Sequence, residues 1–322
     1  MADEGCSAQG AILAFDVGGT RIKTGIIQGD TLIKGEVAAL NHTAGAHTDD
    51  VRSRIIHMGQ SLLAQHNISA IGLSIRGIVD PQSGMILDVN ETLRELIHVP
   101  LGEQLSRELG RPALVENDAR MYALGEFTHG AGRGYANIVC LTLGTGVGSS
   151  VVINGRVLRG QRSMRGILGG HITIQADGPR CSCGNIGCLE ALIGTAALSR
   201  QIEEGLTSDA ASILHKTEHT PRHLFAAAAQ HDRLALSIVD RFARHLGCGI
   251  VSLIHAYDPD VVVLGGGFMH SHHLFLSAVQ AYVDAHAWTI PRGRVVVTPA
   301  TLGDTAALYG VAQAIFHPDM YL

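Results

Sequence analysis

The feature that most constrains the fold of this 322-residue chain is a pattern that occurs twice. Each time, two strands joined by a glycine-rich turn are followed by alternating helices and strands. The first copy has strands expected at 11–15 and 22–27 around the turn Asp16–Thr20, with a third strand at 32–38. The second copy has strands expected at 137–142 and 147–153 around Leu143–Gly146. The repetition predicts two α/β lobes of related layout with a cleft between them.

The remaining apolar spacing completes this plan. It predicts helices at 49–66, 101–109, 119–127, 274–285 and 305–316, a mostly helical region over 191–257, and strands at 70–75, 113–115, 261–264 and 294–298. Residues 181–190 are rich in Cys and Gly, which predicts a loop. We expect a smaller lobe over 1–118, on which a C-terminal helix at about 305–322 packs, and a larger lobe over 119–304.

Composition excludes several classes of protein. Glycine accounts for 39 residues, but there is no Gly-X-Y period and only 9 prolines, so the chain is not collagen-like. Hydrophobic residues make up 46% and the net charge is −5, which excludes intrinsic disorder. With a pI near 6.4, the sequence lacks the excess of basic residues that is typical of nucleic-acid-binding domains. There is no apolar run of roughly 20 residues and no secretory signal at the acidic start, so we expect a cytoplasmic protein without membrane or nucleic-acid partners.

The first glycine-rich turn has the composition of an anion site. Gly18 and Gly19 allow backbone N–H groups to approach a phosphate closely, and Asp16 before them could hold Mg²⁺ directly or through water. An ordinary hairpin turn has the same composition. No Gly-Lys-Ser/Thr follows, so this is not a Walker A loop.

Two further glycine-rich turns also follow apolar strands. Gly144, Gly146 and Gly148 do not complete G-x-G-x-x-G, and a strand is expected next, so a hairpin that cradles phosphate fits better than a dinucleotide fingerprint. Gly265–Gly267 follow the strand at 261–264. They either clear space for a flat ligand such as adenosine or form a helix-entry turn.

Glu116-Asn117-Asp118 follows a short strand and precedes a helix. One interpretation is structural, with Asp118 as the N-cap of the helix. The other is catalytic: a carboxylate at a strand end could accept the proton of a hydroxyl that attacks a phosphate, with Asn117 orienting the substrate.

The strongest single signal is one histidine followed by three closely spaced cysteines, His171, Cys181, Cys183 and Cys188. One imidazole and three thiolates form a tetrahedral set that is typical of closed structural zinc sites. The intervening glycines supply the tight turns that bring three sulfurs to one ion. Chance clustering of reduced thiols is the alternative.

Taken in chain order, these motifs resemble those of the ROK sugar kinases, over about residues 11–316. The motifs that carry the resemblance are Asp16–Thr20, Asn117-Asp118, Gly144-Thr145-Gly146, Gly170-His171, Cys181-x-Cys183-Gly-x-x-Gly-Cys188-x-Glu190 and Gly265–Gly267. The cysteine segment is highly specific, whereas the glycine turns are shared with the wider actin-like ATPases. The resemblance implies an α/β, two-lobed actin-like ATPase (ribonuclease H-like) fold with a zinc-binding loop.

The resemblance also implies an ATP:hexose 6-phosphotransferase, with glucose as the first expectation and with ATP, Mg²⁺ and a structural Zn²⁺ as cofactors. Asp118 would be the catalytic base. The other implied sugar contacts are Gly77, Asn90, Asn117, His171 and Glu190. The implied contacts of the nucleotide and its Mg²⁺ are Asp16, Gly18, Gly19, Thr20, Thr145, Gly146, Gly265, Gly266 and Gly267. The implied zinc ligands are His171, Cys181, Cys183 and Cys188, and a homodimer is expected.

One position departs from the family. ROK kinases read Gly-Glu-x-Gly-His before the zinc segment, and that Glu binds sugar hydroxyls near carbon 1 or 2. Here the stretch is Ile167-Leu168-Gly169-Gly170-His171, so Leu168 stands where Glu is expected. The loss of a charged acceptor would cost about 1.5–3 kcal/mol of sugar binding. Three consequences are open: the substrate differs from glucose at carbon 1 or 2, the affinity for the sugar is low, or Glu190 compensates for the missing carboxylate.

The sequence leaves two alternatives to a glucose kinase open. Asp177-Gly178-Pro179 is similar to the N-acetylmannosamine kinase branch, so the substrate could be N-acetylmannosamine or another amino or N-acetyl hexose. A second alternative is a catalytically weak ROK protein that binds sugar as a sensor. Only 15 residues precede Asp16, too few for the helix-turn-helix module of ROK repressors, so DNA binding is not expected.

Overall fold

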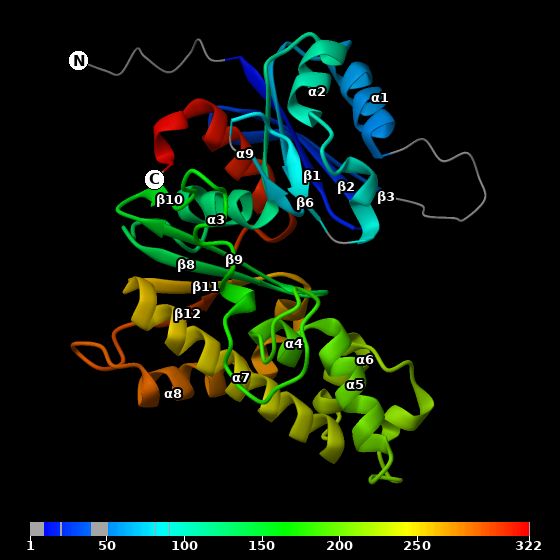
Figure 1. Ribbon diagram of the computed structural model, residues 1–322, viewed down its shortest axis with the longest axis vertical. Helices are drawn as coiled ribbons and strands as arrows, with labels where there is room; N and C mark the ends of the chain where they lie inside the picture. The colour runs from blue at the N-terminus through cyan, green and yellow to red at the C-terminus, as the bar shows by residue number, and fades with distance from the viewer. Residues whose placement is uncertain (1–9, 20, 40–50, 81, 90, 322) are drawn as a thin grey trace. The chain divides into compact units, whose positions relative to one another are not determined.

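A mixed five-stranded sheet, β3-β2-β1-β4-β7, forms the centre of the first of two structural units (Figure 1). Its strands are β1 (Ala11–Val17), β2 (Arg21–Gln28), β3 (Thr31–Ala39), β4 (Ile68–Ile75) and β7 (Ala113–Asn117). Strands β1, β2 and β3 are antiparallel neighbours, whereas β4 and β7 continue the sheet parallel to β1. The computed structural model describes residues 10–19, 21–39, 51–80, 82–89 and 91–321.

Helices cover both faces of this sheet, which is why β1 and β4 are buried along most of their length. Helices α1 (Val51–Leu63) and α2 (Leu101–Leu109) pack on one face and share a core with it. Helices α3 (Asp118–His129) and α9 (Ala306–Phe316) pack together on the other face (Figure 1). A Cβ on Gly125 of α3 would lie 1.9 Å from the carbonyl oxygen of Ala306, so only glycine allows the two helices to approach this closely.

A second sheet has the same design, β10-β9-β8-β11-β12, and its strands other than β10 lie in the second unit. Its strands are β8 (Ile138–Leu143), β9 (Val147–Ile153), β10 (Arg156–Val157), β11 (Val261–Gly265) and β12 (Val296–Pro299). Strand β9 is antiparallel to β8, whereas β11 is parallel to β8 and β12 is parallel to β11. Because the two sheets repeat one order of antiparallel and parallel neighbours, the predicted α/β fold with a repeated layout is confirmed.

The helices of the second unit pack around one long helix, α7 (Arg233–Tyr257). They are α4 (Leu189–Ile193), α5 (Thr195–Leu206), α6 (Pro221–Ala229) and α8 (Leu276–His286). Phe242 of α7 is fully buried and meets Phe225, Phe268 and Phe275 with ring centroids 5.0–6.1 Å apart. No helix of the described residues is long and apolar enough to cross a membrane.

Short elements complete the chain. A two-stranded hairpin pairs β5 (Ile78–Val79) with β6 (Ile86–Asp88). The 3-10 helices are η1 (Glu91–Leu96), η2 (Gly169–His171), η3 (Ile213–Lys216), η4 (Gly267–Leu274), η5 (Gly303–Thr305) and η6 (Pro318–Met320). The region expected as a loop over 181–190 ends slightly earlier, because α4 begins at Leu189.

Neither unit is a single stretch of chain. The first comprises Met1–Arg133, Arg156–Arg165 and Asp304–Leu322, and the second Gly134–Gly155 and Gly166–Gly303. This division differs from the expected boundary at residue 118, because α3 and the short segment Arg156–Arg165 group with the first unit. Helix α9 also belongs to the first unit.

The chain passes between the units four times, and each passage falls at a glycine with a positive φ. These are Gly134 (φ 87°), Gly155 (φ 75°), Gly166 (φ 78°) and Gly303 (φ 54°). Side chains with a Cβ rarely adopt this left-handed conformation. Part of the glycine excess therefore serves the passages between units.

Candidate functional site

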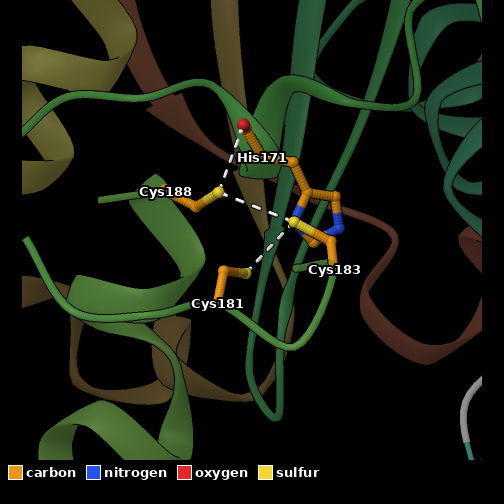
Figure 2. A group of neighbouring side chains, drawn as sticks. All are labelled: His171, Cys181, Cys183 and Cys188. Carbon is orange, nitrogen blue, oxygen red and sulfur yellow. Dashed lines mark hydrogen bonds between the residues drawn. The ribbon is translucent and has the colours of Figure 1, made fainter. Parts of the chain in front are cut away.

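The predicted metal ligands lie together in the second unit. The candidate ligand atoms of His171, Cys181, Cys183 and Cys188 all lie within 4.8 Å of one another (Figure 2). His171 ends η2 and Cys188 precedes α4, while Cys181 and Cys183 come from the loop between them. That loop is held by tight backbone contacts: a Cβ on Gly187 would lie 1.6 Å from the carbonyl oxygen of Gln175.

The spacing of these atoms fits a tetrahedral zinc ion. With Zn–S bonds of about 2.3 Å, two sulfurs on one ion are separated by about 3.8 Å. The Sγ atoms of Cys183 and Cys188 are 3.7 Å apart, and Sγ of Cys181 lies 3.6 Å from Nδ1 of His171. The sulfurs are too far apart for a disulfide, whose S–S bond is about 2 Å. The cluster is therefore compatible with a structural zinc.

The protonation of the thiols also fits a site that needs a cation. Burial raises the pKa of the Cys181 thiol and raises the pKa of Cys188 to about 12, where the neighbouring thiols add to the shift. At Cys183, burial is outweighed by the hydrogen bonds from the Asn185 backbone N–H and from the neighbouring thiols, which lower the pKa, so the three thiols do not ionise alike. A divalent cation would displace their protons and bind the thiolates.

Glu190 links the cysteine loop to the second glycine-rich turn. Its Oε2 accepts a hydrogen bond from the backbone N–H of Val147 (2.9 Å), and its Oε1 accepts one from the Ser182 hydroxyl (3.2 Å). The turn itself is closed by Gly144 N–H donating to the Gly146 carbonyl oxygen (3.0 Å). The predicted sugar contact Glu190 and the predicted phosphate turn thus form one connected structure within the second unit.

Substitution of Gly146 by alanine should destabilise this link. The added Cβ would lie 2.3 Å from Oε2 of Glu190, so the carboxylate must leave the Val147 amide. Loss of this hydrogen bond to a charged acceptor would cost about 1.5–3 kcal/mol. We expect a lower unfolding temperature by thermal denaturation. Gly144→Ala is the matched control, because its Cβ would meet nothing within 4 Å; equal stability of the two variants would contradict the prediction.

Asn117 and Asp118 lie where β7 ends and α3 begins, in the first unit. Asn117, not Asp118, is the N-cap: its Oδ1 accepts from the backbone N–H of Arg120 (3.1 Å). The structural interpretation of Asp118 as the N-cap is therefore wrong. Asn117 Nδ2 donates to the Gly77 carbonyl oxygen (2.8 Å) and to Oδ1 of Asp118 (3.2 Å), so three predicted sugar-site residues are in direct contact.

The Asp118 carboxylate is half-buried at the first position of α3. Burial raises its pKa above the usual 3.8, the nearby Arg76 guanidinium lowers it, and the Asp16 carboxylate raises it; the net shift is upward. A carboxylate with a raised pKa is a stronger proton acceptor than an exposed aspartate. The environment of Asp118 therefore suits a general base.

The first glycine-rich turn joins β1 and β2, and Asp16 lies just before it. Asp16 Oδ1 accepts from the Ser74 hydroxyl (2.8 Å), while its Oδ2 lies 3.3 Å from Nζ of Lys23, its cross-strand partner. Nζ of Lys23 also lies 2.9 Å from the exposed Asp304. Burial disfavours the Lys23 ammonium, but the two carboxylates outweigh it and raise the pKa of Lys23. The two strands that flank this turn thus carry a carboxylate and a cation.

The other predicted contacts are placed as follows. Gly265 ends β11, and Gly266 and Gly267 lead into η4, so the helix-entry interpretation describes their local geometry. Thr145 lies in the turn between β8 and β9, which confirms that a strand follows this turn. Gly18 N–H donates to the Arg21 carbonyl oxygen (3.0 Å), and Gly19 follows it in the same turn. Thr20 and Asn90 lie outside the described residues.

Sequence reasoning did not identify several charged neighbours of these residues. Lys23 and Asp304 were missed because their pairing depends on α9 returning to the first sheet. Glu116 and Arg120, which flank Asn117-Asp118, were missed although their i,i+4 spacing at the start of a helix was a usable signal.

Comparison with known proteins decides the family, because the model of the ROK family matches residues 12–317. The chain belongs to the ROK family. One relative, the glucokinase of Halalkalibacterium halodurans, is 34% identical over 92% of each chain. A solved ROK glucokinase from Streptomyces griseus, in complex with glucose and AMPPNP, has a TM-score of 0.80 and 28% identity, covering 94% of this chain and 98% of its own.

A third comparison concerns another sugar. A solved structure from Listeria monocytogenes, provisionally assigned as an N-acetylmannosamine kinase, has a TM-score of 0.79 and 26% identity, covering 96% of this ROK chain and 99% of its own. The ROK family and the kinase relatives support a sugar kinase that uses ATP.

Proposed function

We propose that this ROK protein transfers the γ-phosphoryl group of ATP to the 6-hydroxyl of a hexose, with glucose as the first candidate. The observation that carries the proposal is Asp118, a half-buried carboxylate with a raised pKa that is held by Asn117 at a strand–helix junction. The glucokinase relatives support glucose.

In this mechanism Asp118 accepts the proton of the attacking hydroxyl. Asn117, whose amide is fixed by the Gly77 carbonyl oxygen and by Asp118, keeps the base and the sugar hydroxyls aligned. His171 and Glu190 are proposed as further sugar contacts, by resemblance to the family. Most of the rate enhancement in phosphoryl transfer comes from such positioning and from electrostatic stabilisation.

The nucleotide end of the proposal uses the glycine-rich turns. Mg²⁺ would neutralise charge that develops on the phosphates, and Asp16 is the carboxylate in place to hold it, directly or through water. Lys23 adds a permanent positive charge 3.3 Å from Asp16. Thr145, Gly146 and the Gly265–Gly267 turn are the proposed phosphate and adenosine contacts.

The zinc proposed at the Cys₃His cluster has a structural part in this function. The cluster would hold the loop that carries Ser182 and the start of α4, which carries Glu190, and through Glu190 it would fix the Val147 end of the phosphate turn. His171 would be both a zinc ligand and a sugar contact. Removal of the metal should therefore weaken sugar binding.

A second candidate substrate is an N-acetyl hexosamine, which Leu168 favours. This side chain is 39% exposed and apolar, at the position where the family uses a carboxylate for sugar hydroxyls. An apolar group there suits an N-acetyl substituent better than a free hydroxyl.

The test is a coupled assay of ADP release with millimolar glucose, mannose, fructose, allose, N-acetylglucosamine and N-acetylmannosamine. We expect turnover with one of these sugars, and the highest kcat/KM identifies the substrate. Sugar binding by calorimetry without ADP release would indicate a sensor instead, and release with none of the six sugars would reject the kinase.

A further inference from the structure

Arg120 is a charged side chain that the proposed reaction does not use, although it lies two residues after the proposed base. Its guanidinium is fully buried and pairs with the almost fully buried Glu116, with Nη1 and Oε1 2.8 Å apart. The desolvation cost of two buried charges is large, and apolar side chains of similar volume would often be more stabilising. The pair therefore needs an explanation other than stability.

The first part of the explanation lies in what Arg120 holds. Besides Glu116, the guanidinium donates to three backbone carbonyl oxygens of the segment Arg156–Arg165. Nε donates to the carbonyl oxygen of Leu158 (3.1 Å). Nη2 donates to the carbonyl oxygen of Ser163 and, at 3.3 Å, to that of Arg165. Ser163 has a φ of 58°, a conformation that a non-glycine residue rarely adopts. The planar guanidinium fork thus fixes a strained segment at several points.

The second part lies in what Glu116 holds. Its Oε1 also accepts from the backbone N–H of Asn117 (2.8 Å). Its Oε2 lies 3.4 Å from Nη1 of Arg159, whose guanidinium covers the Tyr321 ring at 3.9 Å from the centroid. Asn117 in turn caps the backbone N–H of Arg120 and donates to Asp118 Oδ1. A closed chain of hydrogen bonds therefore connects the buried pair to the proposed base.

We propose that Glu116 and Arg120 are a positioning pair, which sets the orientation of the Asp118 carboxylate through Asn117 and holds the segment Arg156–Arg165 against α3. The catalytic consequence rests on the proposed function, whereas the structural consequence for the segment does not. Both residues act through other groups, so neither is catalytic itself.

Arg120→Lys tests the pair, because lysine keeps the charge but cannot reach four acceptors from a planar fork. We expect kcat to fall by about 10²-fold, since small misplacement of a reacting group has effects of this size. The KM for ATP should stay within about twofold of wild type. Amides of residues 158–165 should exchange hydrogen roughly tenfold faster. Guanidinium ion added to Arg120→Ala should restore part of kcat.

Glu126→Gln is the matched control. Glu126 is fully buried on the same helix, but its Oε2 accepts from the backbone N–H of Ala131 at the other end. This variant should lose stability while keeping kcat and the exchange rates of residues 158–165. Two results would overturn the catalytic role of the pair. One is an Arg120→Lys variant with the kcat of the wild type. The other is a decrease in kcat that only matches the decrease in folded protein, as expected for Glu126→Gln.

The hydrogen-exchange measurement separates this proposal from the proposed function. If the wild-type protein phosphorylates no sugar, the kinase is rejected, but faster exchange over 158–165 in Arg120→Lys alone still supports the pair as the clamp of that segment. Unchanged exchange there overturns the pair, whatever the activity.

Discussion

Replacement of Asp118 by asparagine is expected to lower kcat for sugar phosphorylation by a factor on the order of 10²–10⁴, the usual contribution of a general base. Asparagine keeps the size and shape of the side chain, and its oxygen can still accept from the Ala119 backbone N–H, which lies 2.9 Å from Oδ1 in the wild type. What is lost is the group that accepts the proton. Steady-state kinetics with the preferred sugar measure the effect.

Sugar binding provides the control for Asp118→Asn. Calorimetry should give an affinity close to that of the wild type, because Asn117 remains fixed by the Gly77 carbonyl oxygen. In the wild type, kcat should fall as the pH decreases through the raised pKa of Asp118, since the base must be ionised. The pH profile of the variant should lack this acidic decline in kcat. Comparable turnover by the variant would remove Asp118 as the base.

Loss of the metal should have the second large effect. Cys188→Ser is expected to reduce bound zinc from about one ion per chain to almost none, because four ligands close a structural site. If the free energy of unfolding falls by roughly 3–5 kcal/mol, the unfolding temperature of a unit of this size falls by about 6–20 °C. Sugar affinity should fall as well, because Glu190 and His171 would lose their support. Metal analysis, thermal unfolding and calorimetry measure these three effects.

Cys248→Ser is the control for this prediction, because Cys248 is half-buried on α7 and lies outside the cluster. It should keep the zinc content and the affinity for sugar. A preparation that is free of zinc yet has wild-type stability and sugar affinity would contradict the structural role of the metal.

Much of this organisation could be predicted from sequence because it depends on local patterns. The continuous apolar run of β1 and the glycines of the turns place strands and hairpins without tertiary information. The His171 to Cys188 spacing likewise points to one metal site, because three thiols within eight residues converge on a single ion more easily than they pair.

What could not be predicted depends on contacts between distant parts of the chain. Arg120 reads as an ordinary helical residue until the segment Arg156–Arg165 packs on α3 and buries it. The sequence does not distinguish Asn117 from Asp118 as the N-cap of α3, because either side chain can cap and only the backbone geometry separates them. The grouping of α3 with the first unit likewise depends on its packing on α9, where Gly125 and Gly310 allow close contact.

The return of α9 to the first unit has a consequence for how the protein is made. Synthesis proceeds from the N-terminus, and domains fold as their residues become available. The last residues of the second unit, with the whole cysteine cluster, leave the ribosome before Asp304–Leu322, which complete the first unit. The proposed metal centre can therefore assemble on the nascent chain, whereas α3, which carries the proposed base, lacks its packing partner α9 until the last residues emerge.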